Sequence, residues 1–256
     1  MRARFNRNRA FLERAILAYL LPGVAGVINA SGFFAVGAYT SHVTGIVASI
    51  GNDVASSQPW LAARALVFVI SFIFGAMIAT ALILHARRNL RAYYWRPLLL
   101  ECALLLVFAT VNVGSEHGAH LNSLEMTSLL CCAMGLQNAL VTKLSGSIVR
   151  TTHLTGVSTD IGIESMRALD RWWRTGRAPS LRNDSDLAGL RRHLAIWTSF
   201  LIGATAGPLL YLRLGHIAML VPCVLLACLA AFDGWIGLTA HSFVPRVGTW
   251  ERLPVE

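Results

Sequence analysis

Apolar residues gather in six runs that are long enough, or nearly so, to cross a bilayer as helices. A transmembrane helix needs about 20 predominantly apolar residues. The predicted spans are residues 15–37, 62–85, 98–113, 125–144, 194–212 and 217–238. The first run is too long for the apolar part of a cleaved signal sequence, and further spans follow it. We therefore predict an all-α integral membrane protein with six transmembrane helices.

Composition and charge agree with a membrane protein. Of the 256 residues, 55% are hydrophobic and only 14% are charged, while the net charge is +9. With the N-terminus in the cytoplasm, the inner segments hold 20 of the 22 Lys and Arg residues. These inner segments are 1–14, 86–97, 143–193 and 239–256. Cytoplasmic loops carry such an excess, so the basicity indicates topology, with both termini cytoplasmic, and no nucleic-acid partner.

A sequence repeat links the two halves of the chain. The stretch TSHVTGIVASIGND at 40–53 recurs as TTHLTGVSTDIGIE at 151–164. Two further pairs follow in the same order: Asn29-Ala30 with Asn138-Ala139, and Ser-Phe-x-x-Gly-Ala at 71–76 with the same motif at 199–204. The chain is therefore predicted to consist of two related units, residues 15–113 and 125–238.

Each predicted unit has three spans, which is an odd number. The second unit must then enter the membrane from the opposite side, so the fold is predicted to be a 3+3 inverted repeat. Many secondary transporters are built in this way. Channels and membrane proteins without a transport role share this architecture, so it does not by itself decide the function.

The repeated stretch combines glycines and hydroxyl side chains that disfavour a continuous helix. After each break a short apolar stretch follows, at 43–54 and at 154–166. Both are too short to span and suit re-entrant or interfacial helices. Thr40 or Ser41, and Thr151 or Thr152, are the expected N-caps.

The two breaks form the candidate site. Free N–H groups at the starts of the short helices favour anions, and the two histidines can hydrogen-bond a solute or take up a proton. The candidate substrate-binding residues are Asn29, Thr40, His42, Thr44, Asn138, Thr151, His153 and Thr155. In the alternative interpretation these motifs only let helices cross closely and satisfy their own broken backbones.

Other polar residues are weaker candidates. Glu101 and Asp233 lie within spans and are expected to pair with Arg96 or its neighbours, or to line an inner exit path. The cluster Glu116, His117 and His120 is expected to be a solvated loop, so no metal is predicted. The five cysteines have no metal or redox spacing and are expected to be small buried hydrophobes.

The cytoplasmic segment 160–193 begins with alternating apolar and basic residues up to position 177. This pattern predicts a basic amphipathic helix on the inner leaflet, with the lipid bilayer as its partner. It is also a candidate docking surface for another protein.

No catalytic or cofactor-binding motif is found in the chain. The segments GLQNALVTKLSGSIVRTTHLTGVSTDIGIE, 135–164, and GVINASGFFAVGAYTSHVTG, 26–45, resemble the YoaK-type family of bacterial inner-membrane proteins, a domain of unknown function. The resemblance covers residues 15–240 and implies about six spans in a bacterial plasma membrane, without an established activity.

Three functions remain open at this point. The first is a permease or secondary transporter of a small polar or anionic solute, without a cofactor. The second is an intramembrane enzyme on a hydrophobic substrate, with His42 and His153 as acid and base. The third is a non-catalytic membrane partner protein. Sequence does not set the solute or the oligomeric state.

Overall fold

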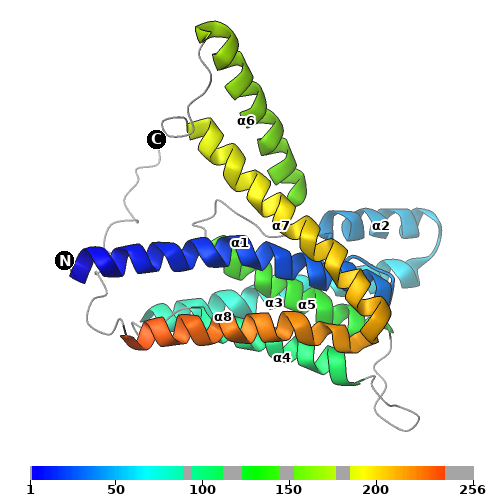
Figure 1. The fold of residues 1–256 in the computed structure, drawn as a ribbon. Helices are drawn as coiled ribbons and strands as arrows, with labels where there is room; N and C mark the ends of the chain where they lie inside the picture. Colours follow the sequence, from blue (N-terminus) through cyan, green and yellow to red (C-terminus); the bar gives the residue numbers. More distant parts are fainter. Residues whose placement is uncertain (1, 89–93, 112–122, 145–152, 177–184, 240–256) are drawn as a thin grey trace.

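The computed structural model consists of helices joined by short connections (Figure 1). In chain order they are α1 (Arg2–Val36), α2 (Val43–Ala55), α3 (Pro59–Arg88), α4 (Trp95–Val111), α5 (Ser123–Leu144), α6 (Leu154–Thr175), α7 (Ser185–Leu214), the 3-10 helix η1 (Gly215–Met219) and α8 (Leu220–Thr239). The structure describes all residues except 1, 89–93, 112–122, 145–152, 177–184 and 240–256. No strand occurs among the described residues. The predicted all-α fold is confirmed.

Among the described residues, four segments are long and apolar enough to cross a membrane. They are Tyr19–Val36, Pro59–Ala86, Ser123–Lys143 and Leu187–Asp233. The last contains both α7 and α8, which are separated by η1 and by Gly215 with a φ of +58°. The predicted character of the chain as a membrane protein is thus confirmed.

Burial separates central helices from peripheral ones. In α1 and α5, 56% and 61% of the spanning window is buried, against 17% in α3. Of the buried polar residues, Asn29 and Ser31 lie on α1, and Thr127 and Gln137 lie on α5. By contrast α3 exposes large apolar side chains along its length, as expected for a helix that faces lipid.

The most extensive helix contacts join the two halves, because α1 packs along α7 and α5 packs along α3. At the first crossing, Gly26 lies against the backbone of Phe200 and Ala204, and Gly203 lies against the carbonyl of Gly23. A Cβ at either glycine would overlap backbone atoms. Only glycine lets the two backbones approach this closely.

The second crossing repeats this arrangement with the partners exchanged. Gly135 of α5 lies against the carbonyl of Phe72, and Gly75 of α3 lies against that of Cys132. In the sequence repeat Gly135 corresponds to Gly26, and Gly75 corresponds to Gly203. The motif Ser-Phe-x-x-Gly, found in α3 and α7, therefore marks one contact that is made twice.

Helices α4 and α8 meet in a reciprocal contact between two cysteines. The Cys102 thiol donates to the Cys223 carbonyl oxygen at 3.4 Å, and the Cys223 thiol donates to the Cys102 carbonyl oxygen at 2.9 Å. Their sulfur atoms are 3.3 Å apart. Each residue thus makes the same contact with the other.

Asp233 of α8 caps the start of α4. Its Oδ2 accepts hydrogen bonds from the backbone N–H groups of Tyr94, at 3.0 Å, and Trp95, at 2.8 Å. The expected ion pair with Arg96 is not formed: Asp233 binds the backbone of the two residues before Arg96 instead, and the Arg96 guanidinium lies 5.3 Å from the centroid of the Trp95 ring. A carboxylate at a helix N-terminus satisfies free N–H groups and interacts favourably with the helix dipole.

The second short helix differs from its prediction. Instead of a dozen-residue helix at 154–166 followed by a separate amphipathic segment, α6 is one helix of 22 residues that ends at Gly176, with a φ of +62°. Together with the first half of α7 it projects away from the bundle (Figure 1). In the first half, α2 has the predicted short length of 13 residues. The predicted tail, 239–256, lies almost wholly outside the described residues.

Candidate functional site

The first helix break lies where the sequence predicts it. Helix α1 ends at Val36, and Gly37 follows with a φ of +73° and donates its N–H to the Phe33 carbonyl at 2.8 Å. A positive φ suits glycine because it lacks a Cβ. The chain resumes as helix at Val43, directly after His42. In the second half α5 ends at Leu144 and helix resumes at Leu154.

The expected N-caps are wrong in both halves where the structure describes them. His42 occupies the N-cap of α2 with φ −87° and ψ 62°, and His153 occupies the N-cap of α6 with φ −85° and ψ 50°. Neither side chain makes a capping hydrogen bond. The matching backbone angles show that the two His-x-Thr-Gly motifs share one local conformation.

The position of the glycine in each motif is explained by a steric constraint. A Cβ at Gly45 would overlap the ring of His42, and a Cβ at Gly156 would overlap the ring of His153. Each imidazole thus lies over the first turn of its own short helix. The pattern His-x-x-Gly is what this local packing requires, while both histidine residues remain exposed.

Asn29 ties the first break to α1. Its side-chain oxygen accepts a hydrogen bond from the Ser41 N–H at 3.1 Å, and the residue is only 8% exposed. Thr40 is fully buried beside Gly32, and within the described residues its hydroxyl has no hydrogen-bond partner. These two predicted site residues therefore point into the protein, beside the exposed His42.

The equivalent residues of the second half are described in part. Asn138 accepts a hydrogen bond from the Thr142 hydroxyl at its backbone oxygen, 2.7 Å away. Thr44 and Thr155 are both exposed, and the backbone oxygen of Thr155 accepts the Thr159 hydroxyl at 2.9 Å. Thr151 lies outside the described residues.

The structure does not bring the two short helices into contact. No contact between α2 and α6 occurs among the described residues, and no hydrogen bond there joins His42 to His153. In the first half, Asn29 lies next to Thr40 and Ser41 at the break, whereas residues 145–152 of the second half lie outside the described residues. That the eight residues form a single site stays a prediction.

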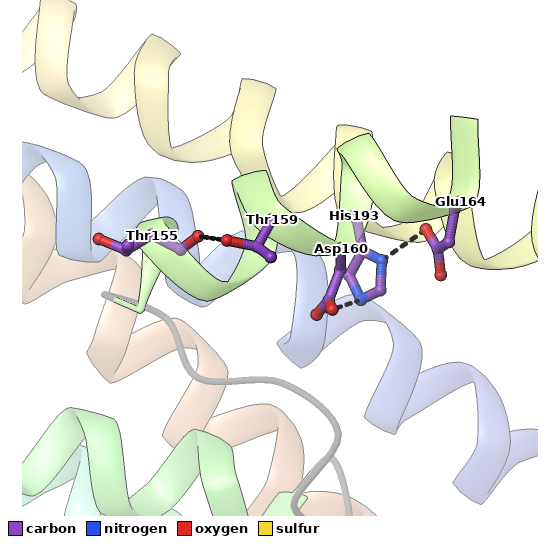
Figure 2. A network of polar contacts seen from close by, with 5 residues as sticks. All are labelled: Thr155, Thr159, Asp160, Glu164 and His193. Carbon is purple, nitrogen blue, oxygen red and sulfur yellow. Dashed lines mark hydrogen bonds and ion pairs between the residues drawn. The ribbon is translucent and has the colours of Figure 1, made fainter. Parts of the chain in front are cut away.

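A polar network that sequence reasoning did not single out lies between α6 and α7 (Figure 2). The Nδ1 of His193 is 2.9 Å from Oε2 of Glu164, and its Nε2 is 4.0 Å from Oδ2 of Asp160. His193 is buried, and the side chain of Glu164 is only 16% exposed. The spacing Asp160–Glu164 places both carboxylates on one helix face, which was a usable signal.

This network belongs to the second half alone. In register with the repeat, Asp160 corresponds to Ser49, Glu164 to Asp53 and His193 to Ala65. Its contacts fasten α6 to the projecting part of α7. Among the described residues no group of three or more His, Cys, Asp or Glu side chains is arranged to hold a metal ion. Glu116, His117 and His120 lie outside those residues.

An apolar groove of about 620 Å³ lies between α1, α7 and α8. Its volume is in the range of small-molecule pockets. The lining is almost entirely apolar, with the hydroxyls of Thr198 and Ser199 as exceptions, and the Ser199 hydroxyl donates to the Tyr19 carbonyl at 2.6 Å. Neither His42 nor His153 lines the groove, so it is not an active site for a His–His enzyme.

Comparisons with known proteins agree with this architecture. The chain is 29% identical over 145 residues to the UPF0700 transmembrane protein YoaK of Bacillus subtilis (strain 168), a match that covers 56% of this chain and 63% of that protein. The matched part is thus less than two thirds of that relative's length. No solved structure matches the chain. The family described as Protein of unknown function (DUF1275) matches residues 17–232, and because that is most of the chain, the protein belongs to the DUF1275 family.

Proposed function

We propose that this protein is a multi-pass permease or secondary transporter for a small polar or anionic solute. The observation that carries the proposal is the exchanged glycine crossing, in which α1 meets α7 as α5 meets α3. Two halves that interlock through equivalent contacts can rock against one another. Such pairs of repeats support inward-open and outward-open states of similar energy.

The reciprocal contact of Cys102 and Cys223 supports an inverted repeat. A contact in which two residues exchange the same bonds is the signature of a two-fold axis between them. We place a pseudo-two-fold axis at this point of α4 and α8, in the membrane plane. It relates residues 15–113 to residues 125–238.

The helix lengths support the proposal of six spans. The candidate segment Leu187–Asp233 has 47 residues, and the break at η1 makes it two helices. Helix α4 has 17 residues, or about 26 Å at 1.5 Å per residue, so a modest tilt or thinning lets it cross the membrane. The basic segments then lie on the cytoplasmic side of a bacterial plasma membrane, with both termini inside.

Topology is the first test of this proposal. Reporter fusions at residue 116 are expected to lie outside, and fusions at residues 92 and 180 inside, because each half crosses the membrane three times. Alkaline phosphatase and fluorescent-protein reporters measure the two sides independently. A cytoplasmic reporter at residue 116 would contradict both the six spans and the inversion.

The exposed histidines are the proposed solute contacts. Each lies at the start of a helix, His42 before α2 and His153 before α6, where free N–H groups favour anionic or polar groups. The lining of the apolar groove gives no support to the alternative enzyme, and nothing in the described residues favours a role limited to partner binding. Solutes that raise the melting temperature of the purified protein are then tested for uptake into proteoliposomes.

His42→Ala and His153→Ala are each expected to reduce uptake of such a solute by at least about ten-fold, the cost of about 1.4 kcal/mol of lost binding. Both rings are exposed, so the melting temperature should change little. Thr159→Ala, on the same helix as the second motif, is the matched control. Unchanged uptake with a lowered melting temperature in both histidine variants would show a structural role instead.

A further inference from the structure

Glu101 is the buried ionisable group that the fold does not explain. It lies on the buried stripe of α4 with Leu98, Leu105 and Phe108, and it is 0% exposed. Within the described residues neither carboxyl oxygen has a hydrogen-bond partner. Asp233 shows the contrast, because two backbone N–H groups satisfy it one helix away.

Among the described residues, no charged side chain is paired with the Glu101 carboxyl group. The thiol of Cys102 is next to it in the chain on α4 and lies 3.3 Å from the thiol of Cys223 on α8. From α5, α3 and η1, which also pack on α4, no described charged residue pairs with it, and His216 of η1 lies against the ring of Phe108. An ion left unpaired in such a place is far more costly than the neutral acid.

We propose that Glu101 is a proton-binding site, which holds a proton while α4 and α8 are packed as in this structure and releases it when they separate. In the binding step the carboxylate takes a proton from hydronium, which leaves a neutral carboxylic acid and water. Release is the reverse step. An apolar residue would stabilise this position better than a carboxylic acid does. The presence of Glu101 therefore indicates a functional role and not a structural one.

The route for the proton is set by the neighbouring contacts. Glu101 lies six residues beyond Trp95, or about 9 Å along α4, from the end that Asp233 fastens to α8. In the proposed topology this is the cytoplasmic end. Water therefore reaches Glu101 when the bonds of Asp233 to Tyr94 and Trp95 open. The idea that this proton drives transport rests on the proposed function. The binding of a proton by Glu101 does not depend on it.

Infrared difference spectroscopy of the full chain in lipid nanodiscs tests the site. At neutral pH we expect a C=O band of a protonated, non-hydrogen-bonded carboxylic acid. It should be lost in Glu101→Gln and kept in Asp233→Asn, the matched control. Glu101→Gln is isosteric and neutral, so its melting temperature should equal or exceed that of the wild type. Absence of the band, or its persistence in Glu101→Gln, would overturn the proposal.

A second measurement tests whether Glu101 releases its proton when α4 and α8 separate. In D₂O the acid band shifts as its proton exchanges for deuterium. Oxidation of the adjacent Cys102–Cys223 pair to a disulfide holds α4 on α8, and should slow this exchange at least about ten-fold. The variant with Cys131, Cys132 and Cys228 replaced by Ala restricts oxidation to that pair.

Asp233→Ala removes the fastening at the end of α4 and should speed the exchange, so the test does not depend on the disulfide. Exchange that neither change alters would refute release by separation. Failure to find a transported solute, with the Glu101 band intact, would count against the transport proposal alone. Loss of the band would remove the proton site whatever the transport results are.

Discussion

Replacing Gly203 with Ala is expected to lower the free energy of unfolding by about 3 kcal/mol or more. The new Cβ would overlap the carbonyl of Gly23 on α1, and backbone atoms on both helices would have to move apart. Gly135→Ala should cost a similar amount, because its Cβ would overlap the Phe72 carbonyl. Reversible unfolding in detergent or nanodiscs, followed by circular dichroism, measures both changes.

The chain contains matched controls for this effect. Gly51 of α2 and Gly162 of α6 are exposed helical glycines, and nothing lies within 4 Å of a Cβ built on either. Alanine at these positions should leave stability unchanged or raise it by about 0.5–1 kcal/mol, because it lowers the entropy of the unfolded chain. If all four alanine variants behave alike, the close crossings are not what holds the halves together.

The double variant Gly203→Ala, Gly135→Ala tests whether the two glycine crossings are independent of one another. Because the two crossings are separate contacts, the losses of Gly203→Ala and Gly135→Ala should add. A double variant that loses much less than the sum would mean that one crossing already loosens the other. That result would favour a single cooperative unit over two independent contacts between the halves.

The all-helical membrane fold could be predicted because a membrane helix is recognisable from the composition of its own segment. Long apolar runs and the placement of Lys and Arg are properties of short segments, and the repeat is visible at identical residues such as His42 and His153. The break after α1 was also predictable, since Gly37 and the hydroxyl-rich segment after it disfavour helix. Helix ends were less certain, and α1 begins at Arg2 rather than near residue 15.

The contacts between distant segments were not predictable from one sequence. Histidine is not a usual N-cap, and its place there depends on how the ring packs on Gly45 or Gly156. Asp233 lies in an apolar stretch of α8, and its bonds go to backbone N–H groups 138 and 139 residues away. The amphipathic pattern of α6 predicted a lipid contact. It did not indicate that Asp160 and Glu164 on this helix contact His193 of α7.

The second large effect is expected at that network, where His193→Ala should lower the free energy of unfolding by about 1.5–3 kcal/mol. The change leaves Glu164, whose side chain is 16% exposed, without its partner on α7. In the same helix, Asp170 and Arg174 form an exposed pair at 3.0 Å. Asp170→Ala should cost at most about 1 kcal/mol, because water screens an exposed pair.

A double-mutant cycle separates the interaction from the loss of packing. If the 2.9 Å contact between His193 and Glu164 holds α6 on α7, the loss in the His193→Ala, Glu164→Ala double variant should be smaller than the sum of the single losses. Hydrogen exchange should then show α6 losing protection before the bundle of α1 and α5 does, since α6 projects from it (Figure 1). Simple additivity of the two changes, with α6 as protected as before, would mean that packing along α7 holds this helix without help from the charges.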